Sequence, residues 1–175
     1  MSTGWSKLLD IGPLADGRAR LAFAIPLAEF SRLAPQLREV AGEATGEVDF
    51  GRENRLAVAD VQVQARLVLT CQRCMGPLPF LLDSEGRAAL VATAAEADRV
   101  PEQLETVFAE GYRVSLRDLV EEELLLALPL VPRHEDEHDC AGPVTGADEV
   151  VRPEAAAPQE THRPFGQLES LLRRR

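Results

Sequence analysis

Hydrophobic and polar side chains alternate most regularly over residues 61–71. The odd-numbered positions are apolar and end at a cysteine: Val61, Val63, Ala65, Leu67, Leu69 and Cys71. The even-numbered positions between them are polar, with Val68 as the one exception. A period of two is typical of a strand with one buried face. The pattern therefore predicts an antiparallel strand that places Cys71 at the end of its buried face.

The same period resumes after Gly76 and Pro77. Its apolar positions are Leu78, Phe80, Leu82, Ala88 and Leu90, and the run continues to Ala92. Two alternating runs joined by a short glycine-containing segment indicate a β-hairpin. The cysteines of Cys71-Gln72-Arg73-Cys74 would then lie at its tip.

Other elements are predicted on both sides of this hairpin. Residues 20–25 are a strand candidate, and Pro26 stands where a proline can open a helix. Gly42 and Gly46 indicate a turn, and residues 93–105 a loop. The positions with helical spacing after Pro26, with a break at Pro35, are Leu27, Phe30, Leu33, Leu37 and Val40.

A second helix is predicted to begin near Ser115. Ser115-Leu116-Arg117-Asp118 resembles a capping box with aspartate in the glutamate position. Residues 121–123 are three glutamates, which we expect mostly on the solvent side of this helix. Residues 128–132, rich in proline, predict an extended exit. The apolar stripe of the helix is Leu116, Leu119, Val120, Leu124 and Ala127.

These elements predict an α+β fold. A single domain over residues 1–140 would hold an antiparallel β-sheet with a long central hairpin and one or two packed helices. Residues 141–163, rich in Ala, Gly, Pro and Glu, predict a flexible acidic linker. Residues 164–175 predict a C-terminal peptide or short helix with Phe165, Leu168, Leu171 and Leu172 on one side.

Composition narrows the classes of partner and compartment. The net charge of −10 disfavours broad electrostatic binding to a phosphate backbone. No segment reaches the roughly 18 consecutive apolar residues of a membrane span, and the first residues lack a signal-peptide pattern. We therefore expect a cytoplasmic protein without membrane contact.

The three cysteines carry the candidate chemistry. Cys71 and Cys74 form a Cys-x-x-Cys, and Cys140 lies near His134 and His138. Thiolates and imidazoles are the ligands of structural zinc, so Cys71, Cys74, Cys140 and one histidine form a candidate site. Two alternatives stay open at this point: a metal-free arrangement in which Cys71 packs as a small apolar residue, and a redox pair. A redox role is disfavoured because this motif lies between strands and not at a helix start.

Four motifs in order resemble the bacterial YceD family of large ribosomal RNA subunit accumulation proteins. They are Cys71-Gln72-Arg73-Cys74, the run from Asp118 to Pro132, the pair His134 and Cys140, and Arg163-Pro164-Phe165-Gly166-Gln167-Leu168. Family members have an asparagine where this chain has Arg163. The better-matched histidine is His134, which we prefer as the fourth ligand, with His138 as its substitute.

The resemblance implies a non-enzymatic factor that promotes accumulation of large-subunit (23S) ribosomal RNA in ribosome biogenesis. Its partner would be this RNA or a pre-ribosomal particle, reached through protein contacts because of the acidic charge. The alternatives are a metal-assisted RNA-processing enzyme, or a protein-binding module acting through Pro164, Phe165, Leu168 and Leu171. The chain contains no Walker A, GxGxxG, GxSxG or HExxH motif, and no catalytic residue is assigned.

Overall fold

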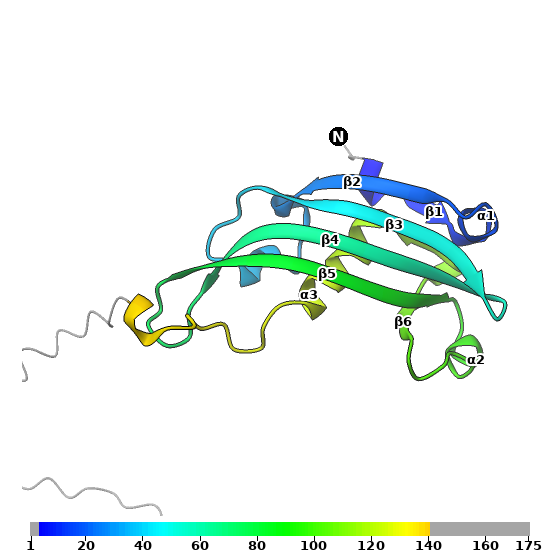
Figure 1. Cartoon of the computed structure of the whole chain (residues 1–175). Coiled ribbons are helices and arrows are strands. Elements are labelled where there is room, and N and C mark those ends of the chain that lie inside the picture. The colour runs from blue at the N-terminus through cyan, green and yellow to red at the C-terminus, as the bar shows by residue number, and fades with distance from the viewer. Residues whose placement is uncertain (1–3, 141–175) are drawn as a thin grey trace, which may run out of the picture. The chain divides into compact units, whose positions relative to one another are not determined.

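The long hairpin lies within a five-stranded sheet. In this computed structural model, which describes residues 4–140, the strand order is β2-β3-β4-β5-β6 (Figure 1). All neighbours are antiparallel except β5 and β6, which are parallel. The strands are β2 (Arg20–Pro26), β3 (Glu43–Glu53), β4 (Leu56–Thr70), β5 (Pro77–Val91) and β6 (Glu105–Phe108).

The sheet confirms the predicted hairpin and the α+β fold. β4 pairs with β5 from Ala57 opposite Leu90 to Thr70 opposite Pro77. The alternate residues of β4 that were expected to face inward are buried, and Cys71 at their end is fully buried. The period-two pattern therefore predicted both the pairing and the buried face correctly.

The turn expected around Gly46 is wrong, because Gly46 lies in the middle of β3 opposite Val63. A Cβ at Gly46 would stand 1.9 Å from the backbone oxygen of Gln62 and 2.9 Å from the ring of Phe23. The glycine therefore permits close strand approach and does not end the strand. β3 and β4 are joined by Asn54 and Arg55, both at positive φ, as in a two-residue hairpin turn.

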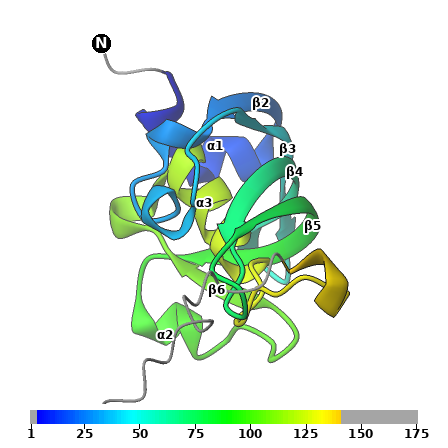
Figure 2. The same ribbon diagram turned by 90° about the vertical axis from the view of Figure 1, so that its left-hand side faces the viewer.

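One face of the sheet is covered by helices. Figure 2 shows α3 (Leu116–Leu126) and α1 (Ile11–Asp16) on the same side of the strands. The core between these layers contains the inward side chains of β2 to β5 together with Leu119, Val120 and Leu124 of α3. The predicted helix start is confirmed, because the Ser115 hydroxyl oxygen accepts the Asp118 N–H at 3.0 Å.

The helix expected after Pro26 is replaced by two short 3₁₀ turns, η2 (Leu27–Glu29) and η3 (Ala34–Gln36). Most of the expected apolar stripe is buried, but Val40 is 45% exposed. The backbone amides of Arg32 and Leu33 donate to the carboxylate of Glu121, at 2.7 and 3.1 Å, so these amides form no helical hydrogen bonds. A contact from a distant segment therefore decides the local conformation.

The solvent-side assignment of the three glutamates is wrong for Glu121, which is 2% exposed. Glu123 is half-buried and accepts a hydrogen bond from the Ser84 hydroxyl at 2.5 Å. A Cβ at Gly86 would lie 1.7 Å from the Glu123 carboxylate, so β5 carries glycine where this side chain crosses it. These glutamates connect α3 to its neighbours.

A second sheet has two strands, β1 (Leu8–Asp10) paired with β7 (Arg113–Ser115). The segment expected as a loop over 93–105 contains one helical turn, α2 (Ala94–Ala97). The other short elements are the 3₁₀ turns η1 (Gly4–Ser6), η4 (Glu110–Tyr112) and η5 (Glu137–Asp139). Across the described range, no helix has the length and apolar character needed to cross a membrane. The linker predicted over 141–163 and the peptide or helix over 164–175, with Pro164, Phe165, Leu168 and Leu171, lie outside the described residues.

Candidate metal centre

The tip of the β4–β5 hairpin holds the Cys-x-x-Cys. The Cys71 N–H donates to the Gly76 carbonyl at 3.0 Å, and the Met75 N–H donates to the Cys71 carbonyl at 2.9 Å. Met75 takes a positive φ of 58° to complete the turn. The Gly76 N–H points at the Cys74 Sγ at 3.4 Å, as expected where a backbone amide stabilises a thiolate.

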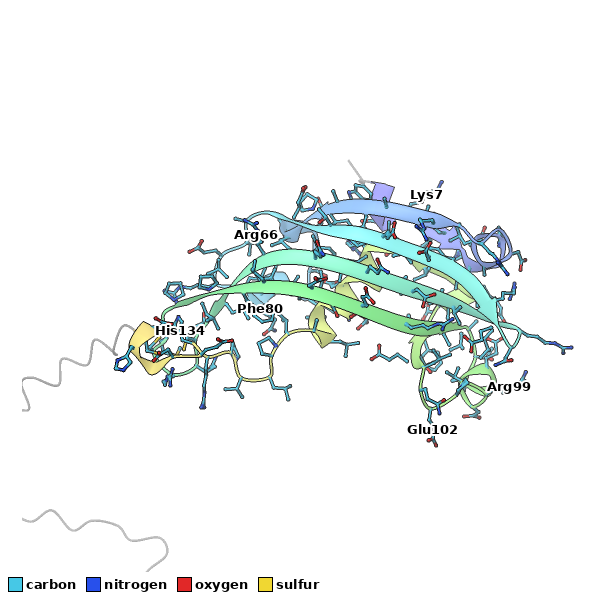
Figure 3. The ribbon with its side chains drawn as sticks, viewed as in Figure 1. Lys7, Arg66, Phe80, Arg99, Glu102 and His134 are labelled. Atoms are coloured by element: carbon cyan, nitrogen blue, oxygen red, sulfur yellow. The ribbon has the colours of Figure 1, made fainter. Side chains whose placement is uncertain are left out.

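The third cysteine and His134 reach this tip along the extended segment that follows α3. Pro129 and Pro132 prevent continued helix, and Leu128 packs against the core. The Gln72 N–H donates to the Pro132 carbonyl at 2.8 Å, which attaches the segment to the hairpin. The chain then turns through residues 134–140, and Figure 3 shows His134 beside the hairpin tip.

Four ligand atoms converge at this point. Cys71, Cys74, His134 and Cys140 present them within 4.8 Å of one another. The Sγ atoms of Cys71 and Cys140 are 4.0 Å apart. The His134 Nδ1 lies 3.6 Å from the Cys74 Sγ and 3.4 Å from the Cys140 Sγ. The residues predicted as ligands from sequence are therefore brought together, although the pair Cys71 and Cys74 lies 60 residues or more from the pair His134 and Cys140 in the chain.

These separations fit a tetrahedral ion. Zinc bonds of about 2.3 Å to sulfur and about 2.0 Å to nitrogen place two sulfurs about 3.8 Å apart, and a sulfur and a nitrogen about 3.6 Å apart. The 4.0 Å between the Cys71 and Cys140 sulfurs and the 3.4–3.6 Å to the His134 nitrogen lie close to these values. The group could therefore hold a metal ion of this size.

The imidazole of His134 is oriented for the same role. Its Nε2 lies 3.1 Å from the Pro77 carbonyl oxygen. A protonated Nε2 donates to this carbonyl and leaves the lone pair of Nδ1 directed at the two sulfurs. An outer hydrogen bond to a backbone carbonyl is the usual partner of a metal-bound histidine.

The environment of Cys71 favours a deprotonated thiol. Burial raises the pKa of the Cys71 thiol, but hydrogen bonds from backbone amides, first that of Cys74 and then that of Arg73, outweigh burial and lower this pKa to about 5. Cys71 is therefore a thiolate at neutral pH, which is the form that binds metal. Burial raises the pKa of Cys140, and the Arg73 guanidinium opposes this shift.

Arg73 was not predicted to have a role. Its Nε lies 3.1 Å from the Cys140 Sγ, and its Nη2 donates to the carbonyls of His134 and Asp136 at 3.0 and 3.1 Å. The guanidinium thus ties residues 134–140 to the hairpin and supplies positive charge beside the sulfurs. Its position between Cys71 and Cys74 is the feature of the sequence that could have indicated a role beside the sulfurs.

His138 is not part of the group. Its side chain is exposed, and its backbone N–H donates to the Asp136 carboxylate at 3.0 Å. Of the two histidines considered from sequence, the structure brings His134 to the sulfurs. Three thiols and one imidazole form a complete tetrahedral set, which is typical of structural and not of catalytic zinc sites.

The comparisons with known proteins cover both the sheet and the Cys/His group. The family model described as "Large ribosomal RNA subunit accumulation protein YceD" matches residues 59–172. A protein from Haemophilus influenzae that bears this name is 35% identical over 169 residues, which cover 93% of this chain and 94% of the relative. No solved structure matches significantly.

Proposed function

Because the chain belongs to the YceD family of large ribosomal RNA subunit accumulation proteins, we propose that it promotes accumulation of large-subunit (23S) ribosomal RNA as a non-enzymatic factor in ribosome biogenesis. The observation that carries this proposal is the near-complete alignment with a relative of that name, 93% of one chain against 94% of the other. A match of this extent includes every element that builds the sheet and the metal centre.

Protein contacts are the proposed route to the particle. The net charge of −10 repels the phosphates of bare RNA, so direct binding would be weak and strongly dependent on salt. An assembling ribosomal particle also presents basic protein surfaces, to which an acidic protein is attracted. The partner proposed is therefore a large-subunit precursor particle, met through its proteins.

Zinc is the proposed occupant of the Cys/His group, held by Cys71, Cys74, His134 and Cys140. Support comes from the spacing of the four ligand atoms and from the soft donor set. The ion would join the hairpin tip to the segment after α3, and its role would be structural. A metal-assisted RNA-processing enzyme needs an open coordination position, which a complete protein ligand set does not leave.

A second candidate is a protein-binding role for the C-terminal segment. The family match continues to residue 172, so it includes Pro164, Phe165, Leu168 and Leu171. We propose that these side chains dock a partner as a short motif, with residues 141–163 as its tether. Deletion of residues 160–175 is expected to abolish complex formation while the thermal unfolding of the remainder is unchanged.

The test of the main proposal is affinity capture of the tagged chain, with ribosomal RNA, proteins and zinc measured in the same sample. We expect large-subunit precursors with their RNA, and stoichiometric zinc. Removal of the gene should lower the ratio of large- to small-subunit RNA, and this chain should restore it. An unchanged ratio in the deletion strain would contradict the proposed function. RNA cleavage that is lost in Cys71→Ser would favour the enzyme.

A further inference from the structure

Within residues 4–140, no helix covers the second face of the sheet. Figure 1 looks onto this face, with α3 behind the strands. Its rows follow from the strand pairing: Ala24, Thr45, Gln64 and Asp83 form one row, and Ala22, Glu47, Gln62 and Glu85 the next. We call the outward side chains of β2 to β5 the open face. It is polar in these two rows apart from the alanines on β2.

Carboxylates outnumber guanidinium groups on the open face. Its acidic side chains are Glu43, Glu47, Asp49, Glu53, Asp60, Asp83 and Glu85, and its basic ones are Arg20, Arg66 and Arg87. Two of these three arginines, Arg20 and Arg87, already form ion pairs with carboxylates of the same face. Arg20 pairs with Asp49 at 2.6 Å and Glu47 at 3.4 Å.

Arg87 likewise forms ion pairs with two carboxylates, those of Glu53 at 2.9 Å and Asp60 at 3.0 Å. Among residues 4–140, no ion pair reaches Glu43 or Glu85. Within the same range, Asp83 accepts a hydrogen bond only from the side-chain amide of Gln64, at 3.3 Å. The carboxylates left without an ion pair are therefore Glu43 at the start of β3 and Asp83 and Glu85 on β5. Arg66 of β4 lies between Glu43 and Leu81 in the same row and offsets one of these charges.

Three consecutive outward side chains of β5 form a line of one apolar and two acidic groups, followed by Arg87. Leu81, Asp83 and Glu85 occupy alternate positions, about 6.8 Å apart on an extended strand. Leu81 is 76% exposed. It lines a hollow of about 550 Å³, together with Asp83, Glu43, Thr45, Gln64 and Arg66 among others.

We propose that the open face docks an extended, lysine- and arginine-rich segment of a protein partner, with an apolar side chain on Leu81 and basic side chains on Asp83 and Glu85. An extended segment repeats its side chains on one face at the same spacing as β5, so alternate residues meet successive positions of the line. Charge complementarity selects a basic partner.

A nucleic acid is the wrong occupant, because its phosphates would face the unpaired carboxylates. The inference rests on the proposed function in one respect, since that function requires protein contacts within an assembling particle. It goes further by naming the surface and the chemistry of the partner.

The experiment uses the full chain and a labelled twelve-residue peptide, two copies of Leu-Thr-Lys-Thr-Lys-Thr, with binding followed by fluorescence anisotropy. A matched peptide carries glutamate at each lysine. Replacement of two attractive surface charges by two repulsive ones in Asp83→Lys/Glu85→Lys should weaken binding about tenfold. Thermal unfolding should be unchanged, because both side chains are exposed.

The control variant, Glu102→Lys/Glu110→Lys, changes the net charge by the same amount away from the open face. Glu102 projects from the loop below α2 in Figure 3, and Glu110 is exposed in η4. This variant should bind within about twofold of the original chain, since screened charges at a distance contribute little. Equal weakening by both variants would overturn the proposal, because the effect would then belong to the net charge.

Two further results would also overturn it: equal binding of the lysine and glutamate peptides, or tighter binding of a single-stranded RNA of similar length. In the deletion strain, Asp83→Lys/Glu85→Lys should restore less large-subunit RNA than the control variant. Full restoration would remove the open face from the function and leave the proposed function standing. Failure of the unaltered chain to restore the RNA would instead refute the proposed function, while the peptide measurement still decides the docking surface.

Discussion

Replacement of Glu121 by alanine should destabilise the fold more than any other change among the three glutamates. The Glu121 carboxylate is 2% exposed, and its Oε1 accepts the N–H groups of Arg32 and Leu33 at 2.7 and 3.1 Å. The Arg32 Nε lies 3.3 Å from Oε2. Alanine removes all three contacts at once and leaves two main-chain donors near the core without an acceptor.

The magnitude follows from these donors. A buried N–H left without a partner costs roughly 1–3 kcal/mol. The Leu33 amide is buried and the Arg32 amide is part-buried, so the two together cost about 2–4 kcal/mol. This is a large part of the roughly 5–15 kcal/mol by which domains are stable. Glutamine retains Oε1 as an acceptor for both N–H groups and loses only the contact with Arg32, so Glu121→Gln should cost about 1–2 kcal/mol.

The assay is urea unfolding of the full chain with its metal site in one defined state, combined with hydrogen exchange at the amides of Arg32 and Leu33. Both amides should lose protection in Glu121→Ala and keep it in Glu121→Gln. Glu122→Ala is the matched control, because Glu122 contacts the same arginine at 2.7 Å but is 44% exposed. Its exposed ion pair should contribute less than about 1 kcal/mol.

Two results would refute this reasoning. If Glu121→Ala costs no more than Glu122→Ala, the buried carboxylate does not hold the segment after Pro26. If glutamine and alanine cost the same, the charge of Glu121 matters and its acceptor geometry does not.

Three other predictions follow from the structure. His134→Ala should lower zinc affinity in chelator competition by more than the roughly 10–100-fold lost with an outer hydrogen-bond partner, whereas His138→Ala should leave it unchanged; the reverse order would exchange their roles. Gly46→Ala should cost about 2–4 kcal/mol in urea unfolding, because its Cβ meets a strand backbone at 1.9 Å, and a neutral result would contradict this contact. Ser115→Ala should cost about 1 kcal/mol by loss of the α3 cap, and unchanged stability would argue against that hydrogen bond.

Patterns that depend on nearest neighbours were sufficient for much of the fold. The alternation through β4 placed Cys71 at the end of the buried face, since side-chain direction in a strand depends only on parity. Ser115 was identified as the cap because its hydroxyl bonds three residues along the chain. Cys71, Cys74 and Cys140 were grouped as ligands from their chemistry, and the structure brings them together with His134.

Strand β3 and the segment after Pro26 were missed because their conformations depend on distant partners. From sequence alone, Gly46 indicates a turn. In the fold, the backbone oxygen of Gln62 on β4 lies where a side chain at position 46 would be, so glycine is required within the strand. Asn54 and the alternation around Val48 were the available signals for this strand. The helical spacing from Leu27 was outweighed by Glu121, which binds two of the amides that a helix requires.

By itself, the sequence determined which side chains face inward in the long hairpin, where α3 begins and which residue types can bind a metal. Each of these depends on chain periodicity or on the chemistry of a single side chain. His134 was preferred over His138 from the family resemblance, and the tertiary structure shows that it meets the sulfurs. Only the tertiary structure decided that Glu121 is buried and that Arg73 joins two segments. These features arise where segments far apart in the chain pack together, and no local pattern records the distance between them.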